Sequence, residues 1–140
     1  MTDSALTNDD EILYRQIHPT FMMEGQLSSQ PFMPTSQAFA PTPKDENKLS
    51  VDRSTITSAA ESFELFKSNG HSSAAVYGVT VGEFGTHDIS CVADPLEATN
   101  NQEANPAHAV ADYSKHGPTQ QKNKAKRLKQ TAIARGKLHP

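Results

Sequence analysis

Hydrophobic and polar residues alternate along two stretches of the chain, as they do in β-strands buried on one face. In residues 12–18 (ILYRQIH), the side chains of Leu13, Arg15 and Ile17 fall on one face. Residues 74–84 (AAVYGVTVGEF) give the strongest strand signal, because one of their two faces is wholly apolar. We expect that face to lie against the core, and it consists of Ala75, Tyr77, Val79 and Val81.

Three shorter segments complete the expected sheet. Residues 49–53 and 89–92 have the length and composition of short strands. Residues 107–113 (AHAVADY) fit either a strand or a short helix. The polar residues 94–105 between them are expected to form a loop.

The best-defined helix signal lies near the middle of the chain. Ser58 and Glu61 form a capping box, in which each side chain accepts a hydrogen bond from the other residue's backbone N–H. We expect this helix to run to about Ser68. It should end at Asn69-Gly70, because glycine allows a left-handed cap.

A second helix is expected after Gly117-Pro118. We expect Thr119 to cap it and Gly136 to end it after Arg135. Its narrow apolar stripe consists of Ala125, Leu128, Ala132 and Ile133. Most of its remaining surface is Lys, Arg, Gln and Asn, so the predicted helix is strongly basic.

The order of these elements predicts an α+β fold with a small mixed or antiparallel sheet, one short capped helix and the basic C-terminal helix. We interpret residues 1–11 as a flexible acidic arm, residues 12–114 as a single domain, and residues 115–140 as the helical tail. The domain includes a loop rich in Pro, Ser and Gln at about residues 20–47. Large apolar side chains of this loop are expected to pack on the body, namely Phe21, Met22, Phe32, Met33 and Phe39.

The composition excludes several classes of protein. The single cysteine, Cys91, excludes an intrachain disulfide and a cysteine-rich zinc site. No apolar run approaches the roughly 18 residues of a membrane-spanning helix, and the acidic start does not resemble a signal peptide. We therefore expect a cytoplasmic protein that does not bind membranes.

The charge is distributed unevenly, although the net charge is only −3. Residues 115–140 contain no acidic residue and carry +8, whereas the rest of the chain carries −11. The basic residues of this tail are Lys115, Lys122, Lys124, Lys126, Arg127, Lys129, Arg135 and Lys137. Lys122, Lys126 and Lys129 recur at helical spacing, which suits a row of backbone phosphates. The alternative is a solvated helix that docks on the protein's own acidic body through its apolar stripe.

Histidine and cysteine give no comparable signal. The six histidines match no known spacing of metal ligands, so we predict no metal site. Cys91 lies in an apolar strand segment, which favours a buried, inert thiol over a nucleophile.

Three residues support an alternative, enzymatic interpretation. Arg15, Ser50 and Glu83 follow the order of arginine, serine and glutamate in ADP-ribosyltransferase folds, each in or at the end of a predicted strand. In such an enzyme the arginine grips the phosphate of NAD, and the glutamate stabilises the positive charge that develops on the ribose. NAD is the cofactor only under this interpretation, and no cofactor is expected otherwise. A structural role for all three residues is the other explanation.

Five segments, LYRQIHP (13–19), PTPKDENKLSVDRS (41–54), YGVTVGE (77–83), NPAHAVADY (105–113) and ARGKLHP (134–140), resemble a family of small uncharacterised bacterial proteins. No activity is established for that family, so the resemblance supplies no catalytic residues. It implies a free-standing bacterial cytoplasmic protein. Polar residues within these segments form a further candidate site: His18, Lys44, Asp45, Glu46, Arg53 and His108.

The sequence therefore predicts a small accessory protein that docks a partner protein or a nucleic-acid backbone through its basic helix. The NAD-dependent enzyme is the alternative. A third interpretation is a subunit whose tail and Phe/Met-containing loop become ordered only within a larger assembly.

Overall fold

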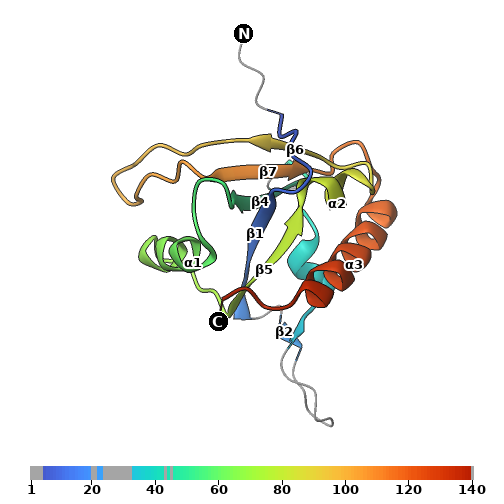
Figure 1. The fold of residues 1–140 in the computed structure, drawn as a ribbon, viewed down its shortest axis with the longest axis horizontal. Helices are drawn as coiled ribbons and strands as arrows, with labels where there is room; N and C mark the ends of the chain where they lie inside the picture. The colour runs from blue at the N-terminus through green and yellow to red at the C-terminus, as the bar shows by residue number, and fades with distance from the viewer. Residues whose placement is uncertain (1–4, 20–21, 24–32, 43, 45, 140) are drawn as a thin grey trace.

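The computed structural model describes residues 5–19, 22–23, 33–42, 44 and 46–139, and its centre is a five-stranded antiparallel sheet with the strand order β5-β1-β4-β7-β6 (Figure 1). The strands are β1 (Ile12–Ile17), β4 (Lys48–Arg53), β5 (Ala75–Thr80), β6 (Ser90–Ala93) and β7 (His108–Asp112). A separate two-stranded ladder joins β2 (Met22–Met23) to β3 (Met33–Pro34). The predicted α+β class is confirmed.

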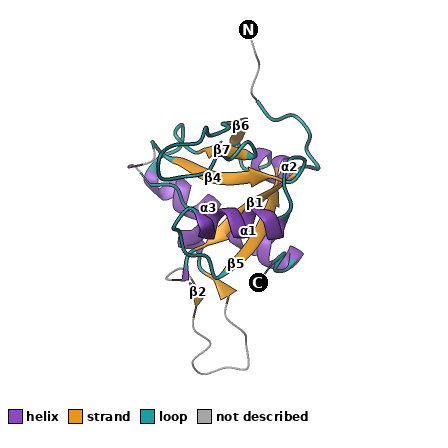
Figure 2. Ribbon diagram, turned by 90° about the vertical axis from the view of Figure 1, so that its left-hand side faces the viewer, coloured by secondary structure: helices purple, strands orange, loops and turns teal. Residues whose placement is uncertain are grey.

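Helices cover both faces of the sheet. Helix α1 (Ala59–Ser68) lies on one side, whereas α3 (Pro118–Arg135) lies on the other with the short 3₁₀ helix η2 (Ser36–Phe39) (Figure 1). Figure 2, viewed from the α1 side, shows α1 and α3 overlapping across the sheet. A short helix, α2 (Val81–Gly85), connects β5 to β6. The layers are thus helix, sheet and helix.

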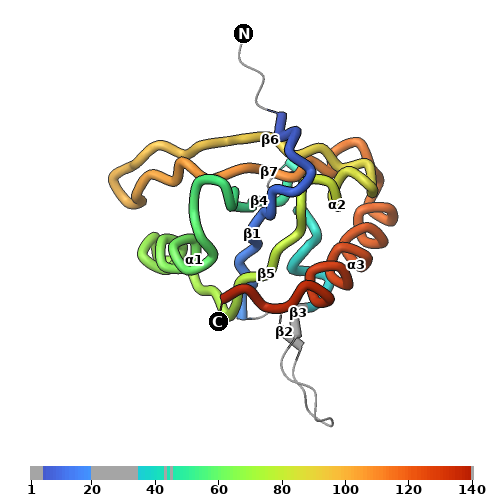
Figure 3. The backbone as a smooth tube through the Cα atoms, in the orientation of Figure 1, coloured from blue at the N-terminus to red at the C-terminus, as the bar shows by residue number. Residues whose placement is uncertain are grey.

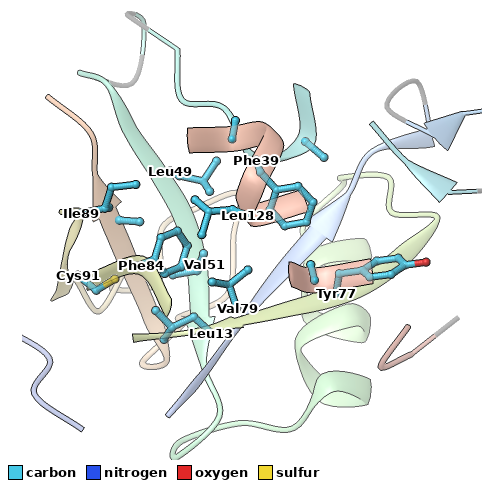
Figure 4. Packing of buried hydrophobic residues seen from close by; sticks show 14 of the residues in the cluster. Leu13, Phe39, Leu49, Val51, Tyr77, Val79, Phe84, Ile89, Cys91 and Leu128 are labelled. Atoms are coloured by element: carbon cyan, nitrogen blue, oxygen red, sulfur yellow. The ribbon is translucent and has the colours of Figure 1, made fainter. Parts of the chain in front are cut away.

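Nearly all of the apolar core lies on the α3 side of the sheet (Figure 4). Leu13 and Ile17 of β1 point to this side, as the alternation predicted, and Phe39 of η2 closes it. The predicted apolar face of β5 is confirmed as well, because its residues join the same cluster. Strand β7 contributes only the small residues Ala109 and Ala111, so the neighbouring strands supply the bulk of the core.

Helix α3 is part of this core. Its predicted stripe is buried, with Ala125, Leu128 and Ala132 at most 1% exposed. The cap prediction was wrong: Gly117 is the N-cap and Pro118 opens the helix, ahead of Thr119. Proline suits the first helical position, because its fixed φ is helical and its missing N–H would have no partner there. The tail is therefore not a separate unit attached to a domain that ends at residue 114.

The stretch at residues 74–84 is only partly a strand, which corrects the sequence interpretation. Strand β5 ends at Thr80, whose hydroxyl accepts a hydrogen bond from Glu83 N at 3.1 Å while Glu83 Oε1 accepts one from Thr80 N at 2.8 Å. This capping box starts α2. Because apolar residues continue past Thr80, the sequence pattern predicted a longer strand and did not reveal that a helix begins there.

The other elements follow the predictions closely. The capping box of Ser58 and Glu61 opens α1, and Gly70 after it adopts a φ of +89°. Strands β4 and β6 match their predicted segments to within one residue, and residues 107–113 contain a strand rather than a helix. The polar loop at residues 94–105 contains no named element.

Terminal segments cover both edges of the sheet (Figure 3). At the β6 edge, Leu6 N donates to Cys91 O at 2.9 Å. At the β5 edge, Leu138 N donates to Val76 O and Val76 N donates to His139 O, both at 2.8 Å. Residues 5–11, which we expected to form a flexible arm, thus lie against the body, and each edge strand is paired at one place with a terminal segment.

The proline-rich loop contributes one anchor to the core. Phe39 is fully buried, and its carbonyl accepts a hydrogen bond from the hydroxyl of Tyr113 at 2.6 Å. Phe21 and Phe32 lie outside the described residues. Met22 and Met33 belong to the two-stranded ladder.

We predict that Leu128→Ala lowers the free energy of unfolding by about 2–5 kcal/mol, because it leaves a cavity in the core beneath α3. Lys126→Ala, an exposed change on the same helix, should cost within about 0.5 kcal/mol. Urea denaturation followed by circular dichroism measures both. Equal effects of the two variants would show that α3 does not support the core.

Candidate functional site

Three of the eight basic residues of the tail are tied to the body. Arg135 forms a two-pronged ion pair with Glu83, in which NH1 and NH2 each lie 2.8 Å from a carboxylate oxygen. Lys115 Nζ lies 2.7 Å from Asp88 Oδ1, and Lys124 Nζ donates to the His87 carbonyl at 2.7 Å. These contacts fix the two ends and one flank of α3 on the α2 region.

The pair of Glu83 and Arg135 is structural in character. Burial alone would raise the pKa of Glu83, but hydrogen bonds from Arg135 and Thr80 outweigh burial and lower it. The same bond to Glu83 raises the pKa of Arg135. Both groups are therefore charged at neutral pH, and they join the N-terminal turn of α2 to the last turn of α3.

The charged side chains of the other five basic residues of the tail have no hydrogen bond or ion pair to any residue that the structure describes: Lys122, Lys126, Arg127, Lys129 and Lys137. All are exposed except Lys129, which is half-buried. Lys122, Lys126 and Lys129 form one row along α3, which we call the lysine row, and it spans about 10 Å of helix. These charges are free to meet an external anion.

A shallow depression flanks α3 next to α2, with a volume of about 480 Å³. Its lining is wholly polar and contains no carboxylate; it includes His87, His116, Lys124 and Arg127. Burial lowers the pKa of His87, and the nearby charges of Lys124 and Arg127 lower it further. His87 is therefore neutral at pH 7, in surroundings that are already positive.

The opposite face of the sheet holds a cavity of about 370 Å³ that the sequence analysis did not predict. Its floor is the polar half of the strand alternation, including Tyr14, Gln16, Ser50, Asp52 and His108. Helix α1 contributes Leu65 and Phe66 to the lining, and the loop at residues 94–107 contributes Leu96, Gln102 and Glu103. This loop extends from β6 and β7 on the α1 side (Figure 1). In the sequence, the signal that could have revealed this cavity was the set of polar residues that alternate with the core residues along the strands.

A hydrogen-bond network organises the floor of this cavity. Ser62 of α1 is 1% exposed; its hydroxyl accepts from Gln16 Nε2 at 2.7 Å and donates to Asp52 Oδ2 at 2.6 Å. Asn105 Nδ2 donates to the other Asp52 oxygen at 2.9 Å. The buried side chains of Gln16 and Ser62 thus both have hydrogen-bond partners, so this part of the floor is well ordered.

The loop at residues 94–107 is tied to the end of α1. Ser68 Oγ donates to Glu103 Oε2 at 2.7 Å, and Glu103 N donates to Asn69 Oδ1 at 2.8 Å. The ring of His71 stacks on Phe66 with centroids 4.8 Å apart, and its Nε2 lies 3.3 Å from the side-chain amide nitrogen of Gln102. These contacts hold the loop against the C-terminal end of α1.

The three residues of the NAD interpretation are not brought together. Arg15 and Ser50 line the cavity, but Glu83 does not belong to its lining and is bound to Arg135. The guanidinium of Arg15 donates to two carbonyls, Ala38 O at 2.7 Å and Ser50 O at 3.0 Å. This arrangement does not support the enzymatic alternative.

The polar residues singled out by the family resemblance occupy different places. Arg53 forms a two-pronged ion pair with Glu11 at 3.0 and 3.2 Å, and the Glu11 side chain is 1% exposed. Lys44, Glu46 and His108 line an open depression on the polar face.

His18 is exposed just after β1, and Asp45 lies outside the described residues. His108 is the one member of the set that also lines the cavity. Its Nδ1 lies 2.9 Å from Asp94 O and 3.3 Å from Asp94 Oδ2.

Other candidate chemistry is limited in the part of the chain that is described. No group of three His, Cys, Asp or Glu side chains there is arranged to hold a metal ion. Cys91 is buried, as predicted, and burial raises the pKa of its thiol to about 12. Within the same residues, no helix has the length and apolar character needed to cross a membrane.

Comparison with known proteins finds no family model, curated protein or solved structure that matches this chain. The resemblance to small bacterial proteins stays a prediction from the sequence. The candidate sites therefore rest on their own geometry.

We predict a pH-dependent contribution of Glu11 to stability. Burial raises the pKa of Glu11, but bonds from Arg53 and Thr55 outweigh it, so the net pKa is lowered from its ordinary 4.5. The stabilisation is present above pH 4.5 and is lost as the pH falls through the lower folded-state value. Glu11→Gln should cost about 2 kcal/mol at pH 7, and this deficit should shrink below pH 4.5.

Urea denaturation of wild type and variant across pH measures this difference. Glu64→Gln, at an exposed position of α1, is the control and should show no such trend. A deficit that does not change with pH would contradict the assignment of the stabilisation to the Glu11 carboxylate.

Proposed function

We propose that this protein binds the phosphate backbone of nucleic acid through the exposed basic side of α3. The observation that supports the proposal is the lysine row, together with Arg127, on a helix whose opposite side is fixed in the core. Because the helix is already ordered, its cations lose little conformational freedom when they meet a phosphate.

The overall negative charge does not oppose this proposal. At physiological ionic strength, charges more than about 8 Å apart in water are largely screened. Glu83 and Asp88 are the acidic partners found for the tail, and each is already paired with a cation. The exposed side of α3 therefore presents a local positive field, although the whole chain carries −3.

The character of this surface favours a phosphate backbone over a partner protein. The centres of protein interfaces are enriched in aromatic residues and methionine. Residues 115–140 contain no Phe, Tyr, Trp or Met, and their largest apolar residues, Leu128, Ile133 and Leu138, are buried or half-buried in the body. Without aromatic side chains to stack on bases, binding should be independent of sequence.

We predict that the protein binds a labelled DNA duplex with an affinity that falls steeply with salt concentration. Lys122→Gln combined with Lys126→Gln should weaken binding and reduce the slope of log K against log salt by about 2, because two phosphate contacts are lost. Fluorescence polarisation at several salt concentrations measures both quantities.

The matched control is Lys44→Gln combined with Lys67→Gln, which removes two exposed positive charges elsewhere. This control has the same net charge and should bind like the wild type. Truncation of the tail is unsuitable, because it would remove buried residues of the core. Absence of binding at low salt, equal losses in both double variants, or tighter binding of poly-glutamate than of the duplex would overturn the proposal.

A further inference from the structure

The cavity beneath the loop at residues 94–107 lies on the opposite face of the sheet from α3, so it is independent of the proposed nucleic-acid surface. Its volume of about 370 Å³ falls within the range of sites that bind small molecules, about 300–1,000 Å³. Sheet, helix and loop each contribute lining residues, and hydrogen bonds hold the loop to the end of the helix. The cavity is therefore built before any ligand arrives.

The floor of the cavity carries a carboxylate without a counter-charge. Both oxygens of Asp52 accept hydrogen bonds from neutral groups, Ser62 Oγ and Asn105 Nδ2, and Asp52 has no ion pair with any described cation. Glu97 and Glu103 line the same cavity. A partly enclosed carboxylate interacts with a cation more strongly than one in open water, because the effective dielectric constant is lower.

The one permanent cation in the lining does not neutralise this charge. Arg15 lies on the strand face that carries Leu13 and Ile17, and its Nε donates to Ala38 of η2, which packs against α3. A second nitrogen of Arg15 donates to the Ser50 carbonyl. These bonds hold the guanidinium to backbone carbonyls instead of to Asp52.

The cavity also has an apolar wall. Phe66, Leu65 and Leu96 line the cavity, and the ring of His71 stacks on Phe66. Leu96 is 42% exposed, which is unusual for a large apolar residue in this protein. An aromatic ligand would cover these side chains, and the face of the Phe66 ring would also attract a nearby positive charge.

The geometry points to a small organic cation as the ligand of this cavity, with an amine that reaches Asp52 and a flat apolar body that packs on Phe66 and Leu96. The carboxylates and the apolar wall together favour such a cation over other classes of small molecule. An anion would meet the three carboxylates, and an aliphatic polyol would leave the apolar wall uncovered.

Tryptamine, tryptophol and indole-3-propionate test this inference as cationic, neutral and anionic probes that share one ring. The chain contains no tryptophan, so the fluorescence of the indole reports binding directly. We expect tryptamine to bind at least about tenfold more tightly than tryptophol, because a charged hydrogen bond is replaced by a neutral one. Indole-3-propionate should bind most weakly.

Two pairs of variants locate the binding site. Asp52→Asn should weaken tryptamine binding about tenfold, whereas Asp112→Asn, which removes a carboxylate outside the cavity lining, should change it less than about twofold. Gln102→Lys places a cation in the lining and should prevent binding, whereas Asn101→Lys adds the same charge next to the lining and should have little effect.

Thermal melting of each variant shows whether it is folded. If Asp52→Asn does not fold, the comparison of Gln102→Lys with Asn101→Lys shows whether tryptamine binds in the cavity. Preference for the anionic or neutral probe, no binding of tryptamine, or equal binding by Gln102→Lys and Asn101→Lys would overturn the inference. None of these results depends on whether α3 binds nucleic acid.

Discussion

The packing of α3 on one face of the sheet is the interaction on which the rest of the structure depends. Leu13, Val79 and Leu128 belong to a single cluster, and without the helix that face would be open to water. Because Ala125 and Ala132 are small, the helix lies close to the sheet, and its remaining positions are left to charged residues. The same helix thus completes the core and displays the cations, so its structural and binding roles cannot be separated by removing the tail.

The other face of the sheet has the opposite character. Polar residues alternate with the core residues there, and the contacts of α1 with them include the network of Ser62, Gln16 and Asp52 as well as the buried Phe63. A helix held in this way leaves space beside it, and the loop at residues 94–107 encloses that space. Positive charge therefore gathers on the α3 side, and carboxylates gather in the cavity on the α1 side.

Local sequence patterns predicted most of the strands and helices. They did not predict contacts between residues that are far apart in the sequence. Alternation located β1 and the start of β5, and the capping box located α1. The second capping box, at Thr80 and Glu83, was present in the sequence but was concealed by the apolar alternation that runs through it. The pairing of Glu83 with Arg135, 52 residues away, depends on the tertiary fold and has no local signature.

The cavity was unpredictable for the same reason. It requires the register that sets Asp52 of β4 opposite His108 of β7, and it requires α1 to reach Asp52 through Ser62. The sequence shows these residues only as polar positions in separate segments. For the basic surface the opposite holds, because the charge of residues 115–140 is visible without any structure. The structure adds which of those charges are already paired.

The most direct test of the central claim is a map of amide chemical shifts in ¹⁵N-labelled protein titrated with a short DNA duplex at low salt. The account predicts shifts concentrated along α3, at Lys122, Lys126 and Lys129, with residues lining the cavity unchanged. A duplex that leaves α3 unperturbed, or that shifts the cavity residues instead, would contradict it.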